Sequence, residues 1–121
     1  MQKRSFGVSV ESIAYTNREL YIGSRILLGS LAVGDVFTEL GTSFHETNGV
    51  TNGTDVELRV TQILTYGQLV SCINAGMTCE IKLAFDKPPR IGPRDYLAGA
   101  SDDSLPQLET LGTAEQNVPT I

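Results

Sequence analysis

Residues 25–37 constrain the fold of this chain more than any other stretch. They read RILLGSLAVGDVF, an apolar run rich in branched side chains that turns between Gly29 and Gly34 and then resumes. Branched side chains stiffen extended backbone, and glycine supplies the positive φ that a tight reversal requires. The stretch therefore predicts a strand, a corner that holds Leu31 and Val33 as a small apolar plug, and a second strand.

The rest of the chain continues this extended pattern. Apolar and polar side chains alternate, as they do in strands with one buried face, and the alternation is cleanest from Met77 to Phe85. Adjacent apolar residues at 26–28 break the period, which suggests either burial on both sides or a bulge. Those at 63–64 break it again and predict a bulge or a twist near Gln62. Further strands are expected at residues 6–13, 20–28, 35–40, 56–64, 69–70 and 96–98. The pattern as a whole predicts an all-β fold: one closed or partly open barrel of six to seven strands.

Length and charge limit the organisation of the chain. Its 121 residues allow one barrel domain, expected at 1–100, and an acidic tail, expected to be flexible, at 101–121. All nine Lys and Arg lie in the first part beside ten of the fourteen acids, and the tail holds the remaining four acids. This balance disfavours nucleic acid as a partner. The sequence lacks an 18-residue apolar run and an apolar leader segment, which favours a cytoplasmic location and no membrane contact.

The candidate partner-binding residues lie in three loops or turns. Lys87, Arg90 and Arg94 form a local basic cluster stiffened by three prolines, which could contact an acidic or phosphate group or could simply be solvated. Phe44 and His45 lie in the polar segment 41–54, a surface loop or hairpin in which Phe44 is expected to fold back onto the barrel. Tyr66 lies at a turn beside Gly67, and it also counts among the aromatic side chains available for packing.

The sequence shows no catalytic constellation. His45 is the sole histidine and has no evident nucleophile, so no catalytic residue, metal site or cofactor is predicted. Cys72 and Cys79 are interpreted as small buried residues, although a cross-strand disulfide around a turn at 75–76 is conceivable. Asp35 is expected to accept backbone N–H bonds in its turn, and Arg25 is expected to pair with an acid on the surface.

From about residue 6 to residue 99 the chain resembles domain 2 of the translational GTPases, the barrel of elongation factor Tu and of its selenocysteine-specific and initiation factor relatives. Three segments carry the resemblance by their order and spacing: SRILLGSLAVGD at 24–35, the strand from 58 to 63 that leads to NAGMT at 74–78, and IGPRDYLA at 91–98. The resemblance implies a barrel without the GTPase domain, since this sequence has no GxxxxGK[ST] phosphate loop.

In elongation factor Tu this barrel helps to hold the aminoacyl end of transfer RNA through an acidic side chain and an asparagine, with an aromatic side chain nearby. Counted without gaps from the Ala75-Gly76 corner, these positions fall on Leu64, Thr78 and Tyr66, and only the aromatic residue matches in kind. The resemblance therefore does not carry the transfer-RNA role over to this chain.

These observations predict a non-enzymatic binding or adaptor module that docks on a protein partner. The alternative is an RNA- or ribosome-associated accessory protein, which the basic cluster supports and the overall acidity opposes. Exposed edges of a partly open barrel can pair between chains, so the expected state is a monomer or a weak dimer.

Overall fold

The computed structural model describes residues 4–16, 18–45, 49–51 and 53–101, so the predicted acidic tail lies outside the described residues beyond Ser101. All regular structure in the described part of the chain is strand, and it contains no helix able to cross a membrane. The strands are β1 (Arg4–Tyr15), β2 (Glu19–Leu28), β3 (Ser30–Ala32), β4 (Val36–Gly41), β5 (Ser43–His45), β6 (Gly49–Thr51), β7 (Thr54–Thr65), β8 (Gln68–Val70), β9 (Cys72–Asn74), β10 (Thr78–Ala84) and β11 (Tyr96–Ser101).

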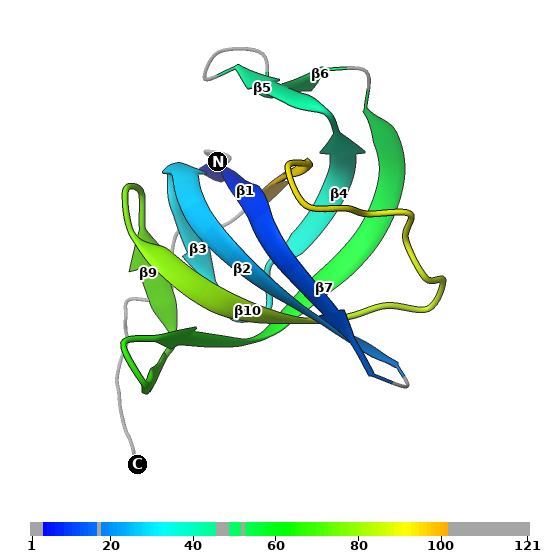
Figure 1. The fold of residues 1–121 in the computed structure, drawn as a ribbon. Coiled ribbons are helices and arrows are strands. Elements are labelled where there is room, and N and C mark those ends of the chain that lie inside the picture. The colour runs from blue at the N-terminus through cyan, green and yellow to red at the C-terminus, as the bar shows by residue number, and fades with distance from the viewer. Residues whose placement is uncertain (1–3, 17, 46–48, 52, 102–121) are drawn as a thin grey trace.

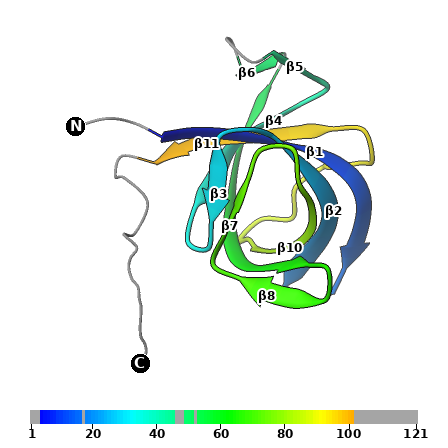
Figure 2. The ribbon, with the colours of Figure 1, turned by 90° about the vertical axis from the view of Figure 1, so that its left-hand side faces the viewer.

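Six of these strands close into a barrel, as the sequence predicted. The hydrogen-bonded order is β10-β2-β1-β11-β4-β7, and a further pairing of β10 with β7 completes the ring (Figures 1 and 2). The strand β8 continues beyond this ring as an addition to the end of β7, while β3 pairs with β9 and β5 pairs with β6 in two small ribbons. Every pairing is antiparallel.

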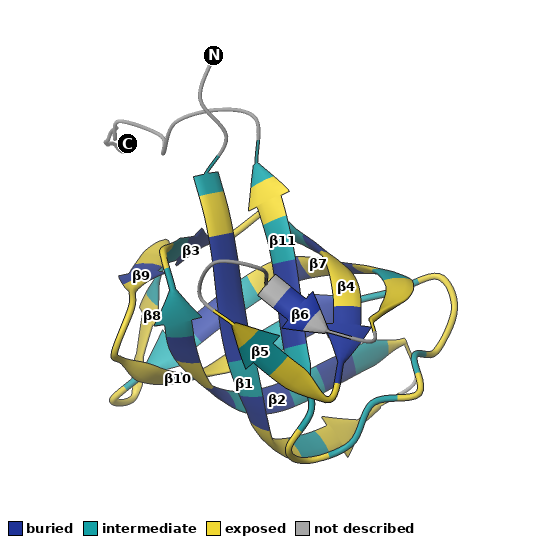
Figure 3. Ribbon diagram, turned by 90° about the horizontal axis from the view of Figure 1, so that it is seen from above, coloured by how far each residue is buried: buried dark blue, intermediate teal, exposed yellow. Residues whose placement is uncertain are grey.

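The barrel interior is filled by the inward-facing aliphatic side chains and two phenylalanines. Phe6 and Phe37 are 1% and 0% exposed, and their rings meet edge to face with centroids 5.6 Å apart. Figure 3 shows the resulting alternation of buried and exposed positions along the strands. Leu31 is fully buried as expected, but Val33 is 43% exposed, so the prediction that both residues fill the corner was wrong for Val33. The chain begins its turn at Val33, and this points its side chain outward.

The predicted bulges occur where two adjacent apolar residues must both be accommodated. The register of β1 against β2 shifts opposite Leu27, and the register of β10 against β7 shifts opposite Thr61, next to Gln62. A bulge adds one residue to one strand of the pair, which changes the face to which the following side chains point. Ile26 and Ile63 therefore both keep their side chains inside the barrel.

The corner after β2 forms as the sequence predicted and holds a partly buried ion pair. Gly29 and Gly34 adopt φ values of +71° and +99°. Asp35 accepts a hydrogen bond from the Ala32 N–H at 2.8 Å, which closes the turn, and its two oxygens accept bonds of 2.9 Å from the Arg4 guanidinium. Because Arg4 also donates to the Ser30 carbonyl at 2.7 Å, the pair fastens β1 to the β3–β4 corner.

Segment 41–54 includes a short ribbon rather than only an irregular loop. The strands β5 and β6 pair from Ser43 opposite Thr51 to His45 opposite Gly49. Phe44 folds back as expected, and its ring stacks on Tyr96 with centroids 6.1 Å apart and an interplanar angle of 23°. This contact attaches the ribbon to the barrel wall at β11.

We predict that Asp35→Ala lowers the free energy of unfolding by about 2–4 kcal/mol, because it leaves the partly buried Arg4 cation without its partner and opens the turn. Urea unfolding followed by circular dichroism measures this loss. Glu19→Gln, which removes the half-exposed ion pair between Glu19 and Lys82, is the control and should change the midpoint little. Equal effects of the two substitutions would contradict the importance of the Arg4–Asp35 pair.

Candidate functional site

The predicted partner-binding residues lie on three separate parts of the barrel. Lys87, Arg90 and Arg94 are exposed on the segment between β10 and β11, and His45 is exposed on the β5–β6 ribbon. Phe44 is half-buried by its stacking on Tyr96. Tyr66 lies at the tip of the β7–β8 hairpin, on the other side of the barrel from the basic segment (Figure 1).

The basic segment is braced by its own hydrogen bonds. The Tyr15 hydroxyl donates to the Pro89 carbonyl at 2.9 Å, and Gly92 N–H donates to the Asp95 carboxylate at 2.7 Å. The Asp95 N–H also bonds the Gly92 carbonyl, so residues 92–95 form a tight turn with Pro93 and Arg94 in its centre. Arg94 has a φ of +78°, the left-handed conformation that the third position of a type II turn requires.

The β7–β8 hairpin turns through two residues with positive φ. Tyr66 has a φ of +50° and Gly67 a φ of +76°, while Thr65 and Gln68 are paired on either side. Type I′ turns need this combination and normally carry Asn, Asp or Gly at the first position. Tyr66 is nevertheless 84% exposed, so packing in the barrel does not account for an aromatic residue here, and its interpretation as a packing residue was wrong.

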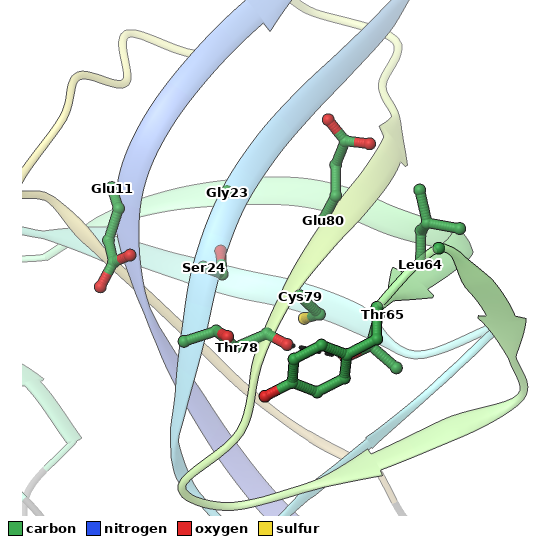
Figure 4. Close-up of a pocket in the computed structure, with 10 residues that line it drawn as sticks. Glu11, Gly23, Ser24, Leu64, Thr65, Thr78, Cys79 and Glu80 are labelled. Carbon is green, nitrogen blue, oxygen red and sulfur yellow. Dashed lines mark hydrogen bonds between the residues drawn. The ribbon is translucent and has the colours of Figure 1, made fainter.

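An open pocket of about 310 Å³ lies beside this turn, between the end of β7, the start of β10 and the middle of β2. Figure 4 shows the residues that line it. Gly23 pairs with Glu80, and Glu80 pairs with Leu64, so these three residues form one row across three strands. The Thr65 hydroxyl donates to the Thr78 carbonyl at 3.0 Å and ties the end of β7 to β10 at the pocket wall.

The pocket unites the three positions that gap-free counting matched to the translational GTPases. Leu64, Tyr66 and Thr78 all line it, although they lie on β7, in the hairpin turn and at the start of β10. Position 64 is apolar where the resemblance calls for an acid, but Glu80 lies directly opposite it on β10. The lining therefore includes a carboxylate, supplied by a different strand.

Three residues that line this pocket were not predicted from the sequence: Glu11, Glu80 and the buried Ser24. The sequence held two hints of this site. Glu80 occupies an outward-facing position on the most regular strand, and Gly23 leaves a strand position without a side chain. Their proximity depends on the pairing of β2 with both β1 and β10. Among the described residues, no group of three or more His, Cys, Asp or Glu is arranged to hold a metal ion.

The two cysteines do not face each other. The strand β9 pairs with β3, whereas β10 pairs with β2 and β7, so the turn at 75–76 does not form a hairpin between them. Cys72 is exposed and Cys79 is half-buried, and both are free thiols. The interpretation of both as buried residues was therefore wrong for Cys72, whose side chain lies on the outer face of the β3–β9 ribbon.

Comparison with known proteins finds a match in fold to a solved structure. No family model and no curated protein matches the chain. Its fold matches the crystal structure of translation elongation factor SelB from Methanococcus maripaludis in its apo form, with a TM-score of 0.59 and 15% sequence identity. The match covers 83% of this chain and 19% of that chain, so this barrel corresponds to about a fifth of the factor's length. The chain thus shares with a translation elongation factor the small closed β-barrel that its sequence resembles.

Proposed function

We propose that this barrel is a non-enzymatic docking module that binds a protein partner through its β7–β8 hairpin. The observation that carries the proposal is the position of Tyr66. A residue in the left-handed region costs about 1–2 kcal/mol unless it is glycine, or a residue such as asparagine that bonds locally. An exposed tyrosine in this conformation gives the barrel no packing in return. Strained residues of this kind cluster at binding sites, and tyrosine is enriched among the residues that dominate interfaces.

The neighbours of Tyr66 extend the apolar surface of the hairpin. Leu69 is 64% exposed and lies opposite Leu64, which lines the pocket. Met77, just before β10, is 38% exposed. Apolar side chains grouped around an open pocket are typical of protein interfaces, whereas single exposed apolar residues are common everywhere. The tyrosine and the two leucines are therefore the core of the proposed contact.

RNA association is the second candidate, and the braced basic segment is the observation in its favour. Lys87, Arg90 and Arg94 are exposed on a segment whose backbone is held by the Tyr15–Pro89 and Gly92–Asp95 bonds, so their charges are presented at little entropic cost. Binding of RNA there would weaken steeply with salt and would not involve Tyr66. The two candidates thus use different surfaces and are separable by experiment.

Two observations support a non-enzymatic role: the Cys79 thiol is not activated, and the histidine lies on a different element from either cysteine. Burial raises the pKa of the Cys79 thiol to about 11, which suppresses the reactive thiolate at neutral pH. His45 lies on the β5–β6 ribbon, and neither cysteine is on that ribbon. A nucleophile and a base must be within hydrogen-bond reach of each other to act together.

We predict that Cys79 resists a thiol reagent near pH 8, where a pKa of about 11 leaves a thiolate fraction of about 10⁻³, while the exposed Cys72 reacts readily. Cys72→Ser and Cys79→Ser variants, labelled separately and read by mass spectrometry, assign each rate. Folding raises the Cys79 pKa above its ordinary value, so burial of the neutral thiol stabilises the fold at neutral pH. That contribution should fade as the pH rises from about 9 to about 11. Fast labelling of Cys79 near pH 8 would argue for an activated thiol and against a non-enzymatic role.

A photo-crosslinking residue at position 66 should capture the partner from a lysate of the source cells. We expect p-benzoylphenylalanine in place of Tyr66 to give defined adducts, while the same residue in place of the exposed Thr38 on β4 gives none. Excess wild-type protein should compete, and a Leu69→Ser variant should compete poorly. Absence of a specific adduct would count against protein docking, and adducts sensitive to ribonuclease would favour the RNA candidate.

Tyr66→Asn should separate folding from function at the hairpin. Asparagine suits the first position of a type I′ turn, so we expect the free energy of unfolding to rise by about 0.5–1 kcal/mol. The same variant should compete poorly for the captured partner, because the exposed ring is lost. If Tyr66→Asn destabilises the barrel, the tyrosine has a structural role and the main support for the proposal disappears.

A further inference from the structure

We propose that the acidic tail of this chain, residues 102–121, binds back onto the basic segment between β10 and β11 and competes there with other anions. This surface is separate from the hairpin that carries Tyr66, so the inference does not depend on the docking function. Three observations carry it: exposed cations without ion pairs on a braced backbone, a tail whose charged residues are all acidic, and a tether long enough to join the two.

The basic segment presents charges that the barrel itself does not use. Lys87, Arg90 and Arg94 are exposed, and none of them forms an ion pair within the described part of the chain. The segment also contains two acids, Asp86 and Asp95, but the Asp95 carboxylate accepts a backbone N–H of its own turn at 2.7 Å. Positive charge is therefore in excess here, and it is held on a backbone that does not have to be ordered when an anion binds.

The β1–β2 hairpin adds an aromatic side chain and a further cation beside the segment. The bond from the Tyr15 hydroxyl to the Pro89 carbonyl holds the end of β1 against the segment. The Tyr15 ring is 48% exposed and meets Phe85 edge to face, with centroids 6.3 Å apart. Arg18 is exposed in the turn that follows β1. The surface thus combines cations with a half-exposed ring, which suits an acidic peptide that also carries apolar side chains.

The acidic tail has this complementary composition. It carries four acids and no lysine, arginine or histidine, and leucines at positions 105, 108 and 111 lie among the acids. All nine lysines and arginines of the chain lie in its first hundred residues, so the tail is attracted to cations of the barrel. The segment from Lys87 to Arg94 gathers three of these cations within eight residues, more densely than any other stretch after Arg4.

The tail begins within reach of the basic segment. The strand β11 separates them and has six residues, a length of about 20 Å. An extended chain covers about 3.4 Å per residue, so Glu109, which is the eighth residue after Ser101, can lie about 27 Å from the end of β11. The acids at 109 and 115 can therefore return along β11 to Arg94 and the rest of the segment.

The covalent tether makes a weak contact effective. Pairs of exposed charges attract each other only weakly, and separate molecules would not associate through a few of them. A short flexible tether, however, supplies an effective concentration on the order of millimolar. The tail then occupies the segment for part of the time and must be displaced before another anion can bind.

The test locates the contacts of the tail in the full chain. A nitroxide spin label is attached at Thr113→Cys in a Cys72→Ser background, in which the Cys79 thiol, with its pKa raised to about 11, stays unlabelled. Paramagnetic loss of amide signal is then measured by NMR on ¹⁵N-labelled protein. At low salt we expect the amides of the basic segment to lose signal, and we expect the signal to return as salt is added.

A neutral-tail variant gives the signal loss that the tether alone produces. Its four acids are replaced by the corresponding amides: Asp102→Asn, Asp103→Asn, Glu109→Gln and Glu115→Gln. At low salt, the signal of the basic segment should be at least about twofold stronger in this variant than with the natural tail. Equal signal in the two proteins would overturn the inference.

A matched pair of double variants tests the cations. Lys87→Gln with Arg90→Gln should restore the signal of the segment, because two of its charges are removed. Arg25→Gln with Arg59→Gln makes the same charge change at exposed positions of β2 and β7, and it should leave the signal loss as it was. Arg25 is a suitable control because it forms no ion pair within the described part of the chain, contrary to the surface pair expected from sequence. Equal effects of the two double variants would contradict a contact at the basic segment.

Two further outcomes separate the tail from other occupants. Signal loss confined to the β7–β8 hairpin would place the tail on the apolar surface at Tyr66, and the inference would be wrong. Decauridylate serves as the competing anion and should restore the signal of the basic segment as it displaces the tail. If decauridylate shifts the amides of Arg90 and Arg94 without restoring their signal, RNA and the tail do not compete and the inference fails.

Discussion

The pairing of β10 with β7 is the constraint on which the rest of the structure depends. It joins the two ends of the strand order and turns a sheet into a barrel, with Ile81 opposite Ile63 and Leu83 opposite Val60 at the seam. All four side chains are buried, so the seam is also the middle of the core. Closure removes the free edges that an open sheet would expose and makes the bulge at Thr61 necessary, because both Val60 and Ile63 must face inward.

The same closure creates the pocket. Gly23, Glu80 and Leu64 come from strands far apart in the chain, and they share a row only because β10 lies between β2 and β7. The outer face of the barrel at this row combines a missing side chain, a carboxylate and an aliphatic residue. The hairpin that continues β7 then brings Tyr66 to the pocket. The proposed docking surface therefore lies directly outside the seam, where paired strands hold its residues in place and little entropy would be lost on binding a partner.

Two turns depart from what folding alone would favour. Arg94 and Tyr66 are the non-glycine residues with positive φ in the described part of the chain, and both are exposed. At the β2–β4 corner, by contrast, glycines occupy the left-handed positions and Asp35 satisfies the turn. The residues of the corner therefore suit its backbone conformation and stabilise it, whereas the side chains of Tyr66 and Arg94 contribute little to the stability of the barrel.

Much of the fold was predictable from local pattern. Alternation identified the longer strands, and adjacent apolar residues pointed to two of the four shifts in strand register. The spacing of Gly29, Gly34 and Asp35 defined the corner and its cap. These features depend on neighbours in the chain, so the sequence expresses them directly. The outward turn of Val33 and the exposure of Cys72 and Tyr66 were missed because alternation does not say where a strand ends and a turn begins.

The sequence by itself determined the barrel, its corner and the resemblance to the translation factors. Only the tertiary structure decided that Leu64, Tyr66 and Thr78 meet Glu11 and Glu80 around one pocket, and that the basic segment lies elsewhere. The physical reason is that strands and turns depend on residues close together in the chain. A site on the outside of a barrel depends instead on which strands become neighbours when the barrel closes. That choice depends on register across the whole ring, which no single stretch of sequence contains.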